Sequence, residues 1–210
     1  NVDLKVTRPE IYFGELANEY VFVDTDTKEF DYPEGEKNVY KNYEGKGGIQ
    51  VSSLFHKALF AARFKTMKIL FAEDINNRSR LLMYRNITTM VDKVAPFLSL
   101  DHDPYMVISN EGRLFWIYDA YTTSDQFPYS QKFPLKRFGN YIRNSVKIVI
   151  DAYNGSMDFY ISDPHDPVIR TFANIFPKLF KDIKAMPEDL RKHVRYPSDL
   201  FFVQTHIYAT

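Results

Sequence analysis

The sequence contains no cysteine, and this absence removes several kinds of chemistry at once. Without thiols the chain forms no disulfide, offers no cysteine ligand to a metal and has no cysteine nucleophile. The absence does not place the protein in a compartment, because cysteine-free proteins occur on either side of a membrane.

Long apolar runs are also missing. No stretch approaches the ~20 apolar residues that span a bilayer, and the apolar residues 200–203 are followed at once by Gln204, Thr205 and His206. No signal peptide is present. The chain begins at Asn1 in strand-like sequence and stops within a predicted helix, so we expect an excerpt of a larger soluble region. Polar helix faces predict that the excerpt is soluble alone.

Net charge is absent, because 27 acidic residues balance 27 basic ones. A neutral chain has no long-range field that would hold nucleic acid. We therefore expect no nucleic-acid partner, and we interpret the local basic stretch as a solvated face or loop. That stretch comprises Lys132, Lys136, Arg137, Arg143 and Lys147.

Aromatic residues are abundant, with 18 Phe and 15 Tyr, so ring packing must supply much of the core. A chain of 210 residues forms one large domain or two small ones. Possible sub-units are a β-rich segment, 1–50, and an α+β segment, 51–210. In the first, residues 10–13 and 19–23 predict strands. A turn is expected at 31–35 and a loop at 37–48.

Two helices are expected next. Ser52 or Ser53 caps the first, whose apolar spacing continues to Phe71. The second covers about residues 80–95 and ends at Pro96.

Two β-hairpins follow. The first pairs residues 105–109 with 113–118, and the second pairs 146–150 with 157–161 around Asn154 and Gly155, a strong turn signal. The last forty-five residues read as helical, with starts at 166–167, 187–189 and 198–199. Hairpins packed with several helices predict an α+β fold.

One short pattern occurs twice. Residues 119–124 are echoed 32 positions later by residues 151–156. A duplicated strand-turn unit and chance use of similar turn residues both explain the echo. We predict that residues 119–121 end a strand.

An aromatic and acidic loop is the candidate binding site, because stacking and hydrogen bonding suit sugars, peptides or cations. The alternative is that the rings pin the loop to the core. Its residues are Tyr118, Asp119, Tyr121, Asp125, Phe127 and Tyr129.

Two strings carry candidate metal ligands. Carboxylates suit Ca²⁺ or Mg²⁺, whereas histidine favours a transition metal. Neither string has calcium-loop spacing, and turn or cap chemistry explains both, so no cofactor is expected. The strings are Asp101, His102 and Asp103, and Asp163, His165 and Asp166.

Enzyme signatures are absent. The glycine-bearing segment 45–48 lacks the P-loop pattern, and no Gly-x-Ser-x-Gly or Ser-x-x-Lys occurs. Ser53 and His56 lie three residues apart, which favours a helix cap over a triad.

Five strings occur together in an order that resembles an uncharacterised family of large bacterial multi-pass membrane proteins, known by a serial uncharacterised-protein-family label. They are residues 8–15, 116–124, 127–130, 140–147 and 151–155. The resemblance implies the soluble region of such a protein, facing outside the cytoplasm and attached to its own transmembrane region. It implies no catalytic residues. Residues 147–161 are also similar to one hairpin of PepSY modules.

Two function hypotheses follow. The first is a noncatalytic envelope module that binds a ligand or partner protein, or regulates the attached membrane domain. The second is an envelope hydrolase that uses the Asp and His clusters with the assistance of a metal. Convergence of Asp101, His102, Asp163 and His165 in one cleft would favour the hydrolase.

Overall fold

The computed structural model describes residues 5–27, 29–34 and 37–209. The chain divides into two compact units. The larger unit comprises Asn1–Gly14 and Ile87–Thr210, and the smaller unit is Glu15–Asn86. These boundaries differ from the division at residue 50 suggested by the sequence, because the first helix packs on strands from both sides of that position. Helices and antiparallel strands occur in both units, so the α+β prediction is confirmed.

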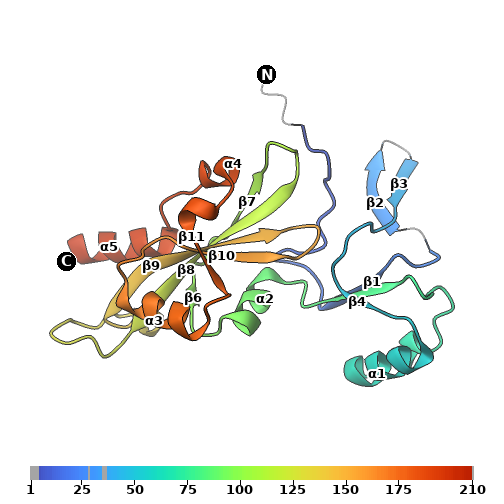
Figure 1. The fold of residues 1–210 in the computed structure, drawn as a ribbon, viewed down its shortest axis with the longest axis horizontal. Coiled ribbons are helices and arrows are strands. Elements are labelled where there is room, and N and C mark those ends of the chain that lie inside the picture. Colours follow the sequence, from blue (N-terminus) through green and yellow to red (C-terminus); the bar gives the residue numbers. More distant parts are fainter. Residues whose placement is uncertain (1–4, 28, 35–36, 210) are drawn as a thin grey trace. The chain divides into compact units, whose positions relative to one another are not determined.

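A twisted sheet organises the larger unit (Figure 1). Its strand order is β11-β10-β9-β8-β6, and β7 also pairs with β8. All pairings are antiparallel except β10 with β11. The strands are β6 (Ser99–Leu100), β7 (Tyr105–Ile108), β8 (Leu114–Ser124), β9 (Tyr141–Asp151), β10 (Met157–Ile161) and β11 (Phe180–Asp182).

In the described part of the larger unit, four α-helices accompany this sheet, and short 3₁₀ turns lie at Lys136–Phe138 and Ile183–Ala185. The helices are α2 (Ile87–Val94), α3 (Pro167–Ile175), α4 (Glu188–Arg191) and α5 (Ser198–Tyr208). The predicted start of α3 is confirmed: Asp166 accepts hydrogen bonds from the backbone N–H groups of Val168 and Ile169. The all-helical interpretation of the last segment is wrong at β11, which adds to the sheet edge.

Apolar side chains that alternate along the long strands form the core of the larger unit. One cluster includes Val107, Ile117, Val149, Tyr160, Met186 and Leu190. Elsewhere Phe97 stacks on Phe172 of α3, with ring centroids 4.0 Å apart. Phe97 lies between α2 and β6 and also contacts Phe180 of β11, so ring packing joins α3 to this segment and to the sheet edge.

The smaller unit, as far as its residues are described, has a three-stranded sheet, a separate hairpin and one α-helix. The sheet order is β1-β5-β4. The elements are β1 (Tyr20–Val23), β2 (Glu29–Glu34), β3 (Lys37–Lys41), β4 (Ile49–Gln50), α1 (Leu54–Phe64), a 3₁₀ turn (Met67–Ile69) and β5 (Arg80–Met83). Ser53 caps α1 by accepting from the N–H of His56, which confirms the predicted cap.

Several predicted boundaries are wrong. The helix expected over 80–95 begins only at Ile87, because Arg80–Met83 forms the central strand β5 and buries Leu81 and Leu82 completely. Residues 10–13 form no strand. The expected loop at 37–48 begins instead as β3, and the expected turn overlaps β2, while its Gly35 lies outside the described residues.

Both predicted hairpins of the larger unit are confirmed. Gly155 has a φ of +70° in the second turn, where an added Cβ would lie 2.6 Å from the Phe13 ring. Residues 119–121 do not end a strand, because β8 continues through a bulge between Ala120 and Thr122. The echoed segment forms a turn, so the two copies differ in structure.

Candidate functional site

The candidate aromatic and acidic loop is split by the structure. Tyr118, Asp119 and Tyr121 are buried in β8. Asp125, Phe127 and Tyr129 lie in the loop after β8. Phe127 and Tyr129 are among the exposed large side chains, and Phe127 stacks on Tyr141 at 5.1 Å. The six residues therefore form no single loop, and only the second half offers an accessible surface.

Asp119 and Lys147 form a buried ion pair. They are direct cross-strand partners in β8 and β9, and the ammonium group donates to the Asp119 carboxylate. The Lys147 ammonium also donates to the Arg195 carbonyl at 3.2 Å. Desolvation raises the pKa of Asp119, while the charge and hydrogen bond of Lys147 oppose that rise. The pair is a structural contact closed off from solvent.

Asp101 and His102 of the first candidate metal string contact Asp199 at the start of α5. Nδ1 of His102 lies 2.7 Å from Oδ1 of Asp199, and this nitrogen must donate because a carboxylate only accepts. Asp101 accepts from the Tyr121 hydroxyl and, at 2.9 Å, from the N–H of Asp199. Burial and the Asp101 contact raise the pKa of Tyr121. This cluster joins β6, β8 and α5.

Among the described residues, the donor atoms of Asp101, His102 and Asp199 form the one group that metal geometry allows, all within 4.8 Å of each other. The chemistry of the set fits a metal poorly. The Arg137 guanidinium already donates to Oδ1 of Asp199 at 2.8 Å. A cation would have to displace this positive charge, so the arrangement works better as a paired cluster.

The second candidate string belongs to another network. Asp166 is fully buried and accepts from the hydroxyls of Thr122, Ser145 and Tyr141 at 2.5 to 2.6 Å. Burial acts to raise the pKa of Asp166, but these hydrogen bonds outweigh it and hold the pKa below its ordinary value. Asp166 therefore caps α3 and also accepts hydrogen bonds from three hydroxyl groups.

The other members of the second string are turn residues. Asp163 accepts from the Arg143 guanidinium at 2.8 Å, and the backbone N–H of His165 donates to Asp163. In the first string, Asp103 pairs with Arg195. Asp101 and His102 thus belong to one network and Asp163 to another, so the contacts do not bring the residues of the expected hydrolase cleft together.

The glycine-bearing segment is not a phosphate cradle. The Arg80 guanidinium donates to the backbone carbonyls of Lys46, Gly47 and Gly48, with distances of 2.6 to 3.0 Å. A site for an anion needs backbone N–H groups, whereas here an arginine holds the carbonyl groups.

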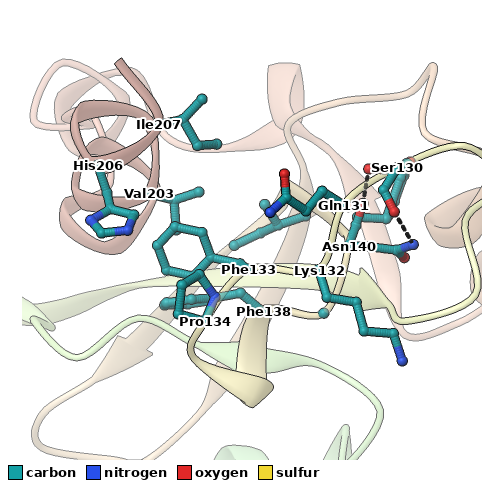
Figure 2. A pocket seen from close by; sticks show the side chains of 13 residues that line it. Ser130, Gln131, Lys132, Phe133, Pro134, Phe138, Asn140, Val203, His206 and Ile207 are labelled. Atoms are coloured by element: carbon teal, nitrogen blue, oxygen red, sulfur yellow. Dashed lines mark hydrogen bonds between the residues drawn. The ribbon is translucent and has the colours of Figure 1, made fainter. Parts of the chain in front are cut away.

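A cavity of about 620 Å³ lies between the segment after β8 and helix α5 (Figure 2). Phe133 is one of the residues that line it. Its ring lies 5.7 Å from that of Phe138 and 5.2 Å from that of His206. Val203 and Ile207 of α5 complete the apolar wall. The sequence predictions missed this cavity, since its walls come from segments about sixty residues apart. The available sequence signals were the Phe133-Pro134 pair and the apolar residues Val203 and Ile207, which lie four positions apart in the last helix.

Asn140 fixes the segment that forms one wall. Its side chain accepts from the N–H of Phe127 at 3.0 Å and donates to the carbonyls of Phe127 and Ser130. The Ser130 hydroxyl donates to the Asn140 carbonyl at 2.8 Å, as Figure 2 shows. A single side chain thereby holds the exposed loop and orients the polar rim, which includes Gln131 and Lys132.

The chain is similar to several curated bacterial proteins, each called a UPF0182 protein. It is 54% identical over 209 residues to one from Desulforamulus reducens, a match that covers 100% of this chain and 22% of the relative. It is 56% identical over 207 residues to one from Geotalea uraniireducens, covering 99% of this chain and 23% of the relative. The chain thus spans less than a quarter of the length of these relatives.

No solved structure matches the chain significantly, so the likeness to PepSY modules stays a prediction. Within the described residues, every helix is too short or too polar to cross a bilayer. The family model described as "Uncharacterised protein family (UPF0182)" matches residues 1–210. The chain therefore belongs to the uncharacterised protein family UPF0182.

Proposed function

We propose that this segment is a noncatalytic, extracytoplasmic module of a bacterial integral membrane protein, and that it binds an amphipathic anion in the cavity beside α5. The cavity carries the proposal. Its volume of about 620 Å³ is in the range of small-molecule sites, about 300–1,000 Å³. Its partner within the protein is the transmembrane region outside this chain, whose activity the bound ligand regulates.

The ligand class follows from the wall and the rim. Phe133, Pro134 and Ile207 offer an accessible surface for an apolar group. Lys132 at the rim offers a cation, held only by a 3.5 Å pair with Asp125 in which both side chains are largely exposed. Such a pair contributes little stability and is readily exchanged for a ligand carboxylate or phosphate.

The noncatalytic part of the proposal is supported by the hydrogen bonds and ion pairs that the buried aspartates already make within the fold. Asp101, Asp151, Asp166 and Asp199 each accept from several donors, and Asp119 is paired with Lys147. A general base or nucleophile needs a lone pair directed at substrate. These carboxylates use their lone pairs within the fold.

The extracytoplasmic and membrane setting is supported by the family resemblance described above. The relatives are more than four times longer than this chain, which leaves room for transmembrane helices elsewhere in them. We also propose that the module has no nucleic-acid partner. Lys147, Arg137 and Arg143 of the basic stretch are each paired with an aspartate.

The cavity is tested with 1-anilinonaphthalene-8-sulfonate, an apolar anion, as the titrated probe. Ile207→Trp should fill the rim and weaken binding at least about tenfold, whereas Ile175→Trp on α3 should leave it unchanged. The two isoleucines are matched, being 59% and 58% exposed. Equal affinity in both variants would contradict the proposal.

The side of the membrane is tested in whole cells expressing the full-length protein. Lys46 is exposed, and the segment has no native cysteine to give background. Lys46→Cys should react with a membrane-impermeant maleimide before lysis. Labelling only after lysis would place the segment in the cytoplasm.

A metal-assisted hydrolase is the second candidate, because Asp101, His102 and Asp199 gather three donor atoms. Zinc titration of the purified chain discriminates the two. We expect no rise in the unfolding midpoint with added zinc, since Arg137 holds Asp199. Stoichiometric binding that His102→Ala abolishes would favour the hydrolase.

A further inference from the structure

Helix α1 of the smaller unit is apolar on two faces. The inward stripe packs on a core of Val51, Ile69 and Leu81 and consists of Phe60, Ala61 and Phe64. The outward stripe consists of Phe55, Ala58, Leu59 and Ala62, which are spaced three and four residues apart and so lie on one side of the helix. All four outward residues are exposed. The exposed surface of this helix therefore includes an apolar stripe in addition to polar residues such as Arg63.

The apolar surface continues beyond the helix. Leu54 at the helix start, and Met67 and Phe71 after its end, are 70%, 60% and 73% exposed. With Phe55 and Leu59, five large apolar side chains within eighteen residues face outward. Isolated exposed apolar residues are normal, but such a concentration marks an interaction surface.

The charge of the same segment has one sign. Residues 54–71 contain Lys57, Arg63, Lys65 and Lys68 and no acidic residue, although acids and bases balance over the whole chain. Arg63, Lys65 and Lys68 are exposed beside the apolar residues. The surface that fits is therefore apolar at depth and anionic at its boundary.

We propose that the outward face of α1 and the 3₁₀ turn after it lie in the interface of an anionic phospholipid bilayer. A short helix with apolar and basic residues and no acids lies in the headgroup region. Phe55, Leu59 and Met67 enter the acyl boundary, and the three exposed cations contact lipid phosphates. Each such cation strengthens binding roughly fivefold.

Flotation of the 210-residue chain with vesicles tests the proposal. We expect binding to vesicles of phosphatidylglycerol and phosphatidylcholine, and weak binding to phosphatidylcholine alone. The double variant Phe55→Ser/Leu59→Ser should lose at least about tenfold in partitioning. Lys68→Gln should lose roughly fivefold, on the anionic vesicles only. Raised salt should weaken wild-type binding.

Leu16→Ser is the matched control, since Leu16 is an exposed apolar residue of the same unit outside α1. It should leave flotation unchanged. Circular dichroism of the double variant checks that it is folded. Unchanged flotation of the double variant would overturn the proposal. So would a concentration-dependent dimer of the wild type that the double variant abolishes, which would assign the face to a second copy. This test is independent of the cavity beside α5.

Discussion

The larger unit buries charged side chains, whereas the described part of the smaller unit buries none. Five aspartates and Lys147 are buried in the larger unit. In the described part of the smaller unit the buried polar residues are Thr25 and Ser79, which are uncharged. Its helix α1 instead turns Phe55 and Leu59 outward. The two units thus differ in whether their interiors hold charge, although both expose some large apolar side chains. Paired buried charges fix a geometry, whereas unpaired exposed rings indicate a partner.

The largest expected effect comes from separating the buried pair in the larger unit. Lys147→Met should destabilise this unit by about 3–5 kcal/mol, because Asp119 is left buried without its cation. Urea unfolding followed by the fluorescence of Trp116, the one tryptophan, measures this unit.

The double variant Asp119→Leu/Lys147→Met is the control, since two apolar groups restore a neutral interior. It should recover most of the lost stability. A single variant as stable as the wild type would show that the pair is solvated, and the contrast between the units would disappear.

The second effect concerns the cap of α3. Asp166→Ala should cost about 2–4 kcal/mol, because the cap is lost and the hydroxyls of Thr122, Ser145 and Tyr141 lose their acceptor. Denaturant unfolding at neutral pH gives the value.

The same residue predicts a pH dependence. The pKa of Asp166 is lowered on folding from an ordinary 3.8, so its stabilising contribution is present above that pH. It is lost as the pH falls through the lower folded value. Asp166→Asn should therefore show a shallower loss of stability below about pH 4 than the wild type. Parallel curves would contradict the assignment.

A smaller effect is expected at Arg137. Arg137→Met should cost about 1–2 kcal/mol, because Asp199 keeps its hydrogen bonds with His102. The guanidinium is about half exposed, which limits the loss. Thermal unfolding by Trp116 fluorescence measures it, and an effect as large as that of Lys147→Met would make the guanidinium as essential as the buried ammonium.

The smallest expected effect on stability comes from the outward stripe of α1 in the smaller unit. Phe55→Ser/Leu59→Ser should change stability by less than about 0.5 kcal/mol, because both side chains face outward. Phe60→Ser, on the inward stripe, should cost more than 2 kcal/mol. Circular dichroism during thermal unfolding compares them. Equal losses would mean that the outward stripe is part of the core.

Local chemistry was predictable from the sequence. Ser53 and Asp166 cap the helices that follow them, and Gly112 and Gly155 adopt positive φ in the predicted hairpin connections. These features depend on residues within a few positions of each other, which is the range over which side chains compete for backbone groups.

Long-range pairing was not predictable. Asp199 meets His102 across 97 positions, and no local rule connects them. Arg80–Met83 has helical spacing with the residues after it, yet pairing with β1 and β4 makes it a strand. The outward stripe of α1 is likewise ambiguous, since spacing alone identifies an apolar face without saying what covers it.

The hydrogen bond from the Ile87 N–H to the Gly14 carbonyl, 3.2 Å long, joins the two points at which the chain leaves and re-enters the larger unit. The smaller unit is thus an insertion at one position of the larger unit, and the two ends of the insertion lie next to each other. Long inserts at such a closed position add little entropic cost per residue. We therefore expect that replacing residues 15–86 with a short glycine linker from Gly14 to Ile87 leaves a larger unit that folds by itself.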